Sequence, residues 1–346
     1  LPLDSVLPPA RIEFLVADGK VSRILTETAL LNRCPVGPTL LQWDENFSAY
    51  TVVADFAATL PRLRPTDPAY LIYTSGSTGQ PKGVLVSHGA FANTATNQAR
   101  LLGLAPGERT LQFSNSSFDA SIFEILGTLL TGAALVSGPS EVLVDPAALP
   151  GFLREQHVTF AVLPPSFLRS LDRTELPLRV LMTAGEAALP EDMQHYAQHL
   201  TAVNGYGPTE AAVCSTMEFV EAATAQTDPN GVPIGRPLDG TELYVLDQNL
   251  QPVPIGVEGE ICVAGNGLAE GYWQQPAQTA RSFVPHPFST DPSARLYRTG
   301  DIGRWLADGR VAFSGRRDGQ IKLRGHRIET GEIEATLRTH PKVYEA

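Results

Sequence analysis

Cysteine is scarce in this sequence of 346 residues, and its three cysteines stand far apart. Cys34, Cys214 and Cys262 form no C-x-x-C pair, so the sequence indicates neither a zinc ribbon nor a disulfide framework. We expect three thiols, which suit a reducing compartment, and we therefore predict a cytoplasmic location.

Positive charge is also in short supply. Asp and Glu together number 37 against 26 Lys and Arg, so the net charge is −11. This surplus of negative charge argues against nucleic acid and against an anionic membrane as partners. An anionic ligand such as a nucleotide would need a local positive charge. Lysine occurs only at positions 20, 82, 322 and 342, so a lysine at a defined place in a motif stands out.

Long apolar runs are missing as well. No run approaches the ~20 residues that a membrane-spanning helix needs. The first residues, LPLDSVLPPARIEF, lack the basic region and apolar core of a signal peptide. The chain is nonetheless longer than one compact core usually allows, so we expect two or more subdomains.

One short stretch, YTSGSTGQPKGV from Tyr73 to Val84, is rich in glycine and hydroxyl residues. Glycines let a backbone approach a ligand, and successive N–H groups in such a turn form an anion-binding concavity. Lys82 adds a positive charge at a fixed place. The spacing is not that of a Walker A loop, because Gln80 and Pro81 separate the last glycine from the lysine. We interpret the stretch as a phosphate loop of another kind, with an ordinary surface loop as the alternative.

Two patterns divide the chain. Up to about residue 227, short apolar runs alternate with helical stretches, which predicts an α/β fold with largely parallel strands. Helices are expected over 11–18, 89–103, 120–132, 148–158 and 190–200, and strands over 21–27, 71–76, 109–114, 133–138, 159–165, 179–186 and 201–207. Ser87 is a plausible N-cap and Gly103 a plausible end for the second helix. From about Asp228, tight turns predict an antiparallel β subdomain with a hairpin at Asp308–Gly309.

Three further clusters combine glycine with polar residues: NGYGPTE (204–210), YRTGD (297–301) and GRRDGQIKLRGHRIETGEIE (315–334). Each alone is typical of an ordinary turn. Together they supply what a nucleotide site needs, namely phosphate donors, a carboxylate for ribose hydroxyls or Mg²⁺, and an aromatic face for the base.

Six stretches follow one another along the chain: AYLIYTSGSTGQPKG, FDAS, NGYGPTE, GEICVAGNGLAEGY, YRTGD and GRRDGQIKLRGHRIETGEIE. Together and in this order they resemble the adenylation domain of a nonribosomal peptide synthetase. That domain belongs to the adenylate-forming superfamily, together with acyl-CoA synthetases and luciferases. The resemblance implies the large-subdomain fold of mixed and parallel sheets flanked by helices, an antiparallel β subdomain, and the beginning of a small C-terminal subdomain. We expect the divisions at 1–227, 228–317 and 318–346.

The resemblance also implies the chemistry. A carboxylate attacks the α-phosphorus of ATP, with Mg²⁺, giving an acyl-AMP and pyrophosphate. The acyl group then passes to the phosphopantetheine thiol of a peptidyl carrier protein, one of the neighbouring synthetase domains expected as partners. This reaction needs positioning and charge neutralisation rather than a protein nucleophile.

Site residues follow by resemblance. ATP binding is expected of Thr74, Ser75, Gly76, Ser77, Thr78, Gly79, Lys82, Asn204, Gly205, Tyr206, Gly207, Thr209, Asp301, Phe313 and Arg316. Lys82, Thr209 and Glu210 are the expected catalytic residues, with Glu210 as the Mg²⁺ ligand. Tyr206 would stack on adenine and Asp301 would bind the ribose. Without the resemblance, Tyr206 would be interpreted as a packed aromatic side chain and Asp301 as a carboxylate that caps a turn. Asp318 falls at the family's hinge.

Asp119 distinguishes branches of the superfamily, because amino-acid-activating members carry an aspartate there that pairs with the substrate ammonium. Its alternative is a helix N-cap before ASIFEIL. The other expected pocket residues are Ala120, Phe123, Val162, Met182, Ala184, Gly205, Val213 and Cys214. All are apolar or small, and Gly205 and Ala184 would leave depth, so we predict a hydrophobic amino acid, with an aromatic one favoured.

Two alternatives to amino-acid activation stay open: an acyl- or aryl-acid CoA ligase of the same superfamily, and a non-catalytic ligand-binding fragment. Family members usually extend beyond both ends of this sequence, and the C-terminal extension carries a lysine used in adenylation. We therefore expect a truncated chain with impaired activity. His195 and His199 have metal-compatible spacing but no third ligand nearby, so a solvated helix face is the better interpretation.

Overall fold

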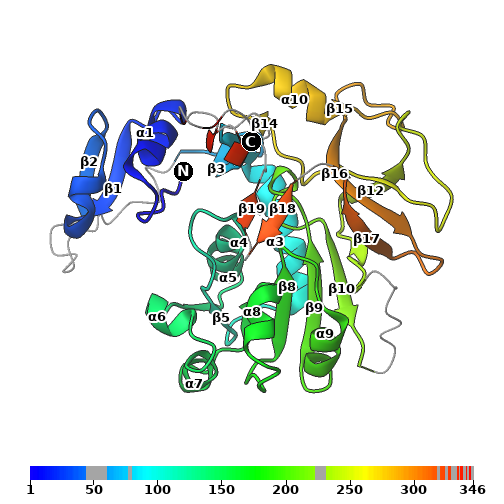
Figure 1. Ribbon diagram of the computed structural model, residues 1–346, viewed down its shortest axis with the longest axis horizontal. Helices are drawn as coiled ribbons and strands as arrows, with labels where there is room; N and C mark the ends of the chain where they lie inside the picture. Colours follow the sequence, from blue (N-terminus) through cyan, green and yellow to red (C-terminus); the bar gives the residue numbers. More distant parts are fainter. Residues whose placement is uncertain are drawn as a thin grey trace.

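The structure is a computed structural model. It describes residues 1–43, 61–76, 80–222, 231–317, 320–323, 326–328, 333–334, 336–337, 340 and 343. Sheets form its frame, with a seven-stranded sheet in the lower half of Figure 1 and a five-stranded sheet at the upper right. A three-stranded sheet contains the strand that leads into the glycine loop.

The seven-stranded sheet confirms the predicted α/β pattern. Its order is β11-β10-β9-β8-β7-β5-β6, in which the last five run parallel and β10 pairs antiparallel with both β9 and β11. The strands are β5 (Arg109–Leu111), β6 (Ala134–Val136), β7 (Phe160–Val162), β8 (Val180–Ala184), β9 (Thr201–Tyr206), β10 (Thr216–Val220) and β11 (Arg236–Pro237). β11 therefore joins this sheet although it follows residue 228, where we expected the subdomain boundary.

Two hydrophobic clusters cover the two faces of this sheet, as the two-residue period of a strand requires. In β8, Val180 and Met182 join one cluster, while Leu181 between them joins the other. The first cluster packs against α3 (His88–Leu102), and the second against α7 (Leu149–Glu155), α8 (Pro165–Ser170) and α9 (Pro190–Ala197). Figure 1 shows α8 and α9 in front of the sheet, with α3 behind it.

Helix α3 begins and ends where the sequence predicted. Ser87 precedes it in an extended conformation, although its side chain makes no capping hydrogen bond. Gly103 ends it with φ +67°, a left-handed conformation that glycine adopts without steric cost. The inward face of α3 carries two polar residues, Thr94 and Gln98, among its apolar ones.

The helix expected over 120–132 is not a single α-helix. It consists of α4 (Asp119–Ile122), a π-turn η2 (Phe123–Gly127) and α5 (Thr128–Leu130). A Cβ on Gly127 would lie 2.6 Å from the Phe123 ring, so this glycine allows the ring to fold back against the helix. Single π-turns inside helices are frequent at functional sites. The remaining short helices are α6 (Ser140–Leu143) and the 3₁₀ turns η1 (Thr28–Arg33) and η3 (Thr209–Ala211).

The strand that feeds the glycine loop lies outside the parallel sheet, which corrects the expectation drawn from the alternation. β3 (Pro68–Thr74) pairs antiparallel with β4 (Lys82–Ser87), and β14 (Gly271–Tyr272) pairs with β4 from the other side. The loop thus joins the two strands of a hairpin, and Lys82 is the first residue of its return strand.

The chain after residue 240 forms the predicted antiparallel β structure. Strands β12 (Thr241–Leu246), β13 (Gly259–Gly265), β16 (Arg295–Trp305), β15 (Phe283–Pro285) and β17 (Val311–Arg316) build one sheet, flanked by α10 (Pro276–Ser282). The hairpin between β16 and β17 turns at Asp308–Gly309, with Gly309 at φ +80°. A second antiparallel pair is formed by β18 (Ile321–Leu323) and β19 (His326–Ile328).

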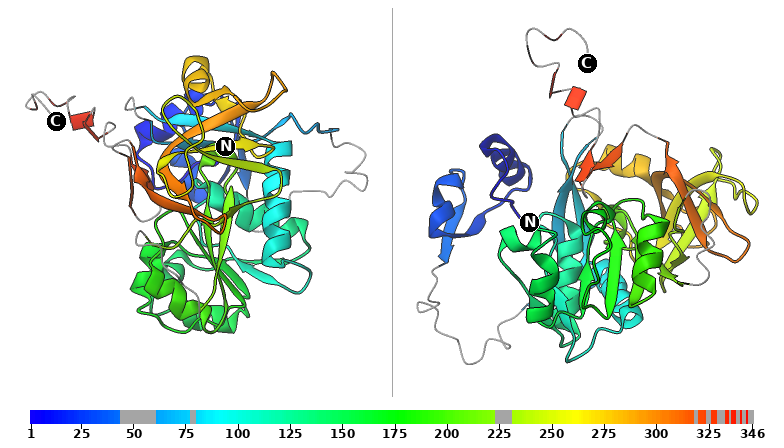
Figure 2. Two further views of the ribbon diagram at one scale, coloured as in Figure 1. Left: turned by 90° about the vertical axis from the view of Figure 1, so that its right-hand side faces the viewer. Right: turned by 60° about the horizontal axis from the view of Figure 1, so that its bottom comes forward.

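An N-terminal lobe, α1 (Pro9–Asp18) with β1 (Arg23–Glu27) and β2 (Thr39–Trp43), lies at the periphery (Figure 2). The backbone carbonyl of Asp18 accepts hydrogen bonds from Trp273 and Gln274, and its carboxylate accepts one from the Tyr73 hydroxyl. The lobe is therefore held against the strands that flank the glycine loop.

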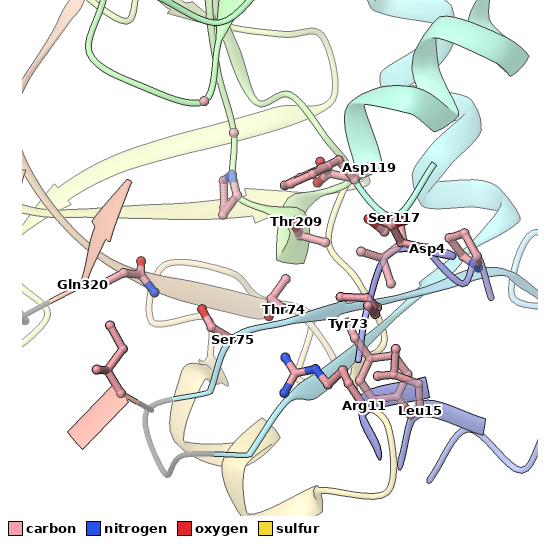
Figure 3. A pocket seen from close by; sticks show the side chains of 18 of the residues that line it. Asp4, Arg11, Leu15, Tyr73, Thr74, Ser75, Ser117, Asp119, Thr209 and Gln320 are labelled. Carbon is pink, nitrogen blue, oxygen red and sulfur yellow. The ribbon is translucent and has the colours of Figure 1, made fainter. Parts of the chain in front are cut away.

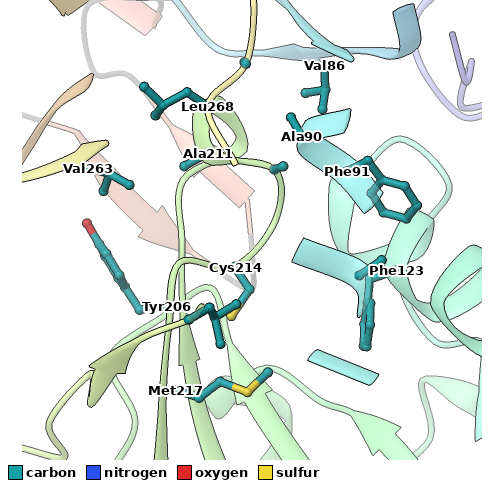
Figure 4. Close-up of a cluster of buried hydrophobic side chains, with 14 of the residues drawn as sticks. Val86, Ala90, Phe91, Phe123, Tyr206, Ala211, Cys214, Met217, Val263 and Leu268 are labelled. Carbon is teal, nitrogen blue, oxygen red and sulfur yellow. The ribbon is translucent and has the colours of Figure 1, made fainter. Parts of the chain in front are cut away.

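The first cluster extends across all three larger sheets, and Figure 4 shows part of it around Phe123, Tyr206 and Val263. The cysteines are free thiols, as expected, and burial raises the pKa of Cys214 and of Cys262 to about 12. None of the described helices has both the length and the apolar character needed to cross a bilayer.

Candidate functional site

A cavity with a volume of about 710 Å³ opens between β3, the end of β9, β16 and the N-terminal lobe (Figure 3). Several residues of the predicted nucleotide site line it: Thr74, Ser75, Tyr206, Gly207, Thr209, Asp301 and Arg316. They come from segments more than two hundred residues apart, which the fold brings together at one opening.

Other predicted nucleotide residues lie around a neighbouring cavity of about 300 Å³. Asn204, Gly205 and Phe313 line this one, together with Tyr206, Asp301 and Arg316 from the larger cavity. Gly76 lies at the start of the loop, where a Cβ would come within 1.9 Å of the Gln80 carbonyl oxygen. Ser77, Thr78, Gly79 and the expected hinge residue Asp318 lie outside the described residues.

Lys82 and Glu210 form a buried ion pair. The Lys82 Nζ lies 3.2 Å from Glu210 Oε1, and their side chains are 7% and 0% exposed. The Tyr272 hydroxyl lies between them, accepting a hydrogen bond from Lys82 (3.1 Å) and donating one to Glu210 (2.8 Å). Neither charged residue lines the two cavities above or the pocket described below. The two expected catalytic charges are therefore brought together, but they face each other and not a cavity.

Tyr206, Asp301 and Arg316 form a second buried cluster. The Tyr206 hydroxyl donates a 2.6 Å hydrogen bond to Asp301 Oδ2, and the Arg316 guanidinium is paired with Asp301 Oδ1. Burial, followed by the Asp301 charge, raises the pKa of Tyr206 well above its ordinary value, so the phenol stays protonated as a donor. The Phe313 ring lies 6.4 Å from that of Tyr206, leaving an aromatic wall beside the carboxylate.

A third cavity, of about 210 Å³, contains the whole predicted amino-acid pocket. All nine residues named from the sequence line it: Asp119, Ala120, Phe123, Val162, Met182, Ala184, Gly205, Val213 and Cys214. The structure adds Gln98, Phe113, Ser114, Asn115, Phe118, Pro164, Gly185 and Gly207 to this lining. The nine residues named from the sequence therefore share one cavity, and the fold adds the rest of its wall.

Asp119 stands at the junction between cavities, since it lines both the 710 Å³ and the 210 Å³ one. It is the first residue of α4, and Phe118 occupies the N-cap position, so the alternative of an Asp119 N-cap is wrong. Gly185 and Gly207 line all three cavities. A Cβ on Gly207 would lie 2.6 Å from the Cα of Cys214, so only glycine fits there without displacing backbone.

The backbone at Ala212 and Val213, next to the end of β9, is strained. Val213 has φ +79° and Ala212 has φ +52°, both in the left-handed region. A β-branched residue there is a genuine outlier, and such strain concentrates at ligand sites. Gly205 does not leave open depth as expected, because the Met182 side chain occupies that space; a Cβ on Gly205 would lie 2.1 Å from Met182 Cε.

Glu124 is a functional candidate that the sequence analysis did not single out. Its carboxylate is fully buried and accepts hydrogen bonds from the backbone N–H groups of Phe113 and Ser114 and from the Ser114 hydroxyl. Burial outweighs these bonds and raises the pKa of Glu124 to about 8. Because Phe113 and Ser114 line the 210 Å³ cavity, Glu124 fixes one wall of the pocket.

Sequence reasoning missed other contributors as well. Asp4, Arg11 and Leu15 of the N-terminal lobe line the large cavity, and Tyr272 completes the Lys82–Glu210 pair. Tyr272 ends the GEICVAGNGLAEGY motif, so its place in a recognised motif was an available signal. The lobe residues lie in LPLD and PPARIEFLVAD, stretches that also resemble a family segment upstream of the phosphate loop, so a similar signal was available for them.

The described residues contain no group of three His, Cys, Asp or Glu side chains that could hold a metal ion. A single carboxylate, Glu210, nevertheless fits Mg²⁺, because this ion is usually held by one or two carboxylates together with substrate phosphates. His195 faces His199 with ring centroids 6.1 Å apart, without a third ligand among the described residues.

Comparison with known families and structures places the chain. A family model described as "AMP-binding enzyme" matches residues 1–273, so the chain belongs to the AMP-binding enzyme family. Bacitracin synthase 3 from Bacillus licheniformis is 42% identical over 349 residues, covering 100% of this chain and 5% of that protein. Tyrocidine synthase 1 from Brevibacillus parabrevis is 38% identical over 355 residues, covering 100% and 32%. The resemblance to adenylation domains of nonribosomal peptide synthetases is thereby confirmed.

Solved structures agree in fold. An artificially fused adenylation–PCP di-domain from Klebsiella oxytoca, NpsA-ThdA, matches with TM-score 0.87 and 29% identity, covering 99% of this chain and 69% of that one. The Vibrio cholerae adenylation domain AlmE, in complex with glycyl-adenosine-5′-phosphate, matches with TM-score 0.85 and 25% identity, covering 99% and 70%. The chain spans less than a third of the length of the curated relatives it matches.

Removing the Lys82 charge should destabilise the fold strongly. Lys82→Met leaves the Glu210 carboxylate buried without its cation, which costs ~3–5 kcal/mol of unfolding free energy. Glu210→Gln should cost a similar amount, and the double variant should lose clearly less than the sum. Urea unfolding of the four proteins measures this coupling. Additive losses would contradict a direct interaction between the two charges.

The stability of the protein should depend on pH through Glu124. Its pKa rises from 4.5 in the unfolded chain to about 8 in the folded one, so the folded state binds the proton more tightly. This contribution to stability is therefore lost as pH rises from about 4.5 through about 8. Glu124→Gln should remove this dependence of the free energy of unfolding on pH. The stability of the variant relative to wild type should therefore rise with pH.

Urea unfolding between pH 5.5 and 8.5 would measure that slope. The matched control is Glu191→Gln, because the Glu191 side chain is 80% exposed. Parallel curves for wild type and Glu124→Gln would show that Glu124 keeps an ordinary pKa.

Proposed function

We propose that this chain activates an amino acid with ATP, forming an aminoacyl-AMP and pyrophosphate for transfer to the phosphopantetheine of a peptidyl carrier protein. The observation that carries the proposal is Asp119. Its carboxylate lies where the nucleotide-sized cavity meets the side-chain-sized cavity, the position at which a substrate's ammonium and carboxylate would both be needed.

The proposed nucleotide contacts follow the walls of the two larger cavities. The Tyr206 and Phe313 rings would lie against adenine, and Asp301 would accept hydrogen bonds from the ribose hydroxyls. Thr74 and Ser75 would donate to the phosphates that leave as pyrophosphate, with Thr209 beside the α-phosphate. A positive charge is needed near these oxygens, and Lys82 is the expected source.

That role requires Lys82 to exchange its present partner for phosphate. Glu210 would then lose its cation, and a Mg²⁺ ion bound with the nucleotide would neutralise it, supplying charge stabilisation at the phosphates. The buried pair thus suits a site in which lysine and carboxylate separate only when nucleotide and metal arrive together. A small C-terminal subdomain from residue 318, hinged at Asp318, stays part of this proposal, as do the divisions at 227 and 317.

We propose a hydrophobic side chain for the substrate, with an aromatic one favoured. Phe123, Val162, Met182 and Cys214 provide apolar walls, and Asp119 is the only charged residue among the described ones that line the small cavity. Carrier and synthetase partners are proposed because another similar solved structure is of an NRPS protein that contains adenylation and PCP domains. The cytoplasm suits an ATP-dependent protein whose three cysteines are thiols.

Thermal shift with non-hydrolysable aminoacyl-sulfamoyl adenosines tests the function. A ligand that binds only the folded state raises the free energy of unfolding by ~2.7 kcal/mol when its concentration is a hundredfold above Kd. An aromatic analogue should stabilise the chain, its des-amino version should bind at least tenfold more weakly, and Asp119→Asn should abolish that difference. Asp239→Asn is the matched control and should keep it, because the Asp239 side chain is 79% exposed and lines none of the three cavities.

The two alternatives predict other results. Equal binding of the amino and des-amino analogues would assign the chain to the acyl- or aryl-acid ligases. Binding of ATP with Mg²⁺ but of no acyl-adenylate analogue would identify a ligand-binding fragment.

Adding one methyl group at Gly205 should narrow the pocket. Its Cβ would collide with Met182 Cε, which forces the flexible Met182 side chain toward the cavity. Gly205→Ala should therefore weaken binding of a large aromatic analogue roughly tenfold, and Gly205→Ala with Met182→Ala should recover most of it. Isothermal titration measures both, and unchanged affinity in the single variant would show that Met182 moves away from the pocket.

A further inference from the structure

Gln98 is a buried amide without a partner in an otherwise satisfied pocket. Its side chain is 0% exposed, and neither its Oε1 nor its Nε2 has a hydrogen-bond partner among the described residues. Burying an amide without hydrogen bonds is costly, so such a group in a native structure needs an explanation. Gln98 lies on the inward face of α3 and lines the 210 Å³ cavity.

The other polar groups of this cavity wall are already engaged. The Ser114 hydroxyl donates to Glu124, and the Asn115 amide donates to Asp4 while its oxygen accepts from Ser117. The Cys214 thiol donates to the Thr216 carbonyl. Apart from Asp119, to which the substrate's ammonium is assigned, the hydrogen-bonding capacity left over among the described lining side chains is therefore that of Gln98.

Gln98 and Asp119 occupy different parts of the cavity. Asp119 and Phe118 line both this cavity and the 710 Å³ one, so they mark the junction where the substrate's reacting end belongs. Gln98 lines the small cavity and is absent from the lining of the other two. It therefore meets the substrate's side chain rather than its ammonium or carboxylate.

We infer that Gln98 is a specificity-determining residue that hydrogen-bonds a polar group on the substrate side chain, and that the substrate is a phenolic amino acid. This inference rests on the proposed function. A phenol has an apolar ring for the walls formed by Phe123, Val162 and Met182, and one hydroxyl that can donate to or accept from an amide. A purely apolar side chain would leave the Gln98 amide unsatisfied, and a short polar one would leave the apolar walls unfilled.

The expected discrimination is substantial. A site built to hydrogen-bond a substrate hydroxyl rejects the analogue that lacks it, because the buried polar group of the protein is then left unpaired. Wild type should therefore bind tyrosyl-sulfamoyl adenosine at least tenfold more tightly than phenylalanyl-sulfamoyl adenosine. Isothermal titration of the full chain with these two probes measures the ratio.

Gln98→Met tests the residue itself, since methionine has similar length and no hydrogen-bonding amide. The variant should lose the preference, by weakening the tyrosyl probe and strengthening the phenylalanyl one. Its thermal stability without ligand should equal or exceed that of wild type, because no intramolecular hydrogen bond is lost.

Thr94→Val is the matched control. Thr94 lies one turn earlier on the same face of α3, and its hydroxyl is likewise buried without a partner among the described residues, but it does not line the 210 Å³ cavity. This variant should keep the tyrosyl preference.

Each outcome has one meaning. A tyrosyl preference that disappears in Gln98→Met and persists in Thr94→Val supports the inference. Equal binding of both probes by wild type, or a preference that survives in Gln98→Met, overturns it while leaving amino-acid adenylation in place. If neither probe binds wild type, the inference about Gln98 is overturned, and the proposed function fails as well only if no other aminoacyl-sulfamoyl adenosine binds.

Discussion

The contact between Lys82 and Glu210 connects the two halves of this molecule. Lys82 begins β4, in the three-stranded sheet, whereas Glu210 lies in η3 directly after β9, in the seven-stranded sheet. Two opposite charges buried this deeply are stable only when paired, so the pair fixes the spacing between the sheets. The large cavity opens beside this connection, with Thr74 on one side and Thr209 on the other.

Local patterns in the sequence were sufficient for much of the fold. Helix α3 follows from its apolar face and from Gly103, and the β16–β17 hairpin follows from Asp308–Gly309. The π-turn at Phe123 was not predictable in this way, because it depends on a ring packing against Gly127 in three dimensions. The antiparallel pairing of β3 was missed for a related reason: alternation of strands and helices does not say which strands become neighbours.

In the candidate site, too, some features could be predicted from local sequence patterns and others depend on the three-dimensional fold. The nine residues expected of the amino-acid pocket all line one cavity, although Val162, Met182 and Ala184 lie outside the quoted motifs. Gln98 lies in an unremarkable helix, and its importance appears only when burial, missing partners and the cavity are seen together. The pairing of Lys82 with Glu210 likewise joins two motifs whose expected roles were separate. Sequence motifs name the parts of a site, whereas the partner of each charge is a property of the fold.

The glycines at the meeting point of the three cavities have a consequence for how such a domain changes over time. Gly185 and Gly207 border every one of these cavities but present only backbone to them. Apart from Phe118 and Asp119 at the junction with the large cavity, side chains that face the small cavity can therefore be exchanged without altering the boundary formed by these glycines. Under the proposed function, a chain built this way could come to accept a different substrate side chain while its nucleotide site stays the same, so that the choice of substrate and its activation would vary independently.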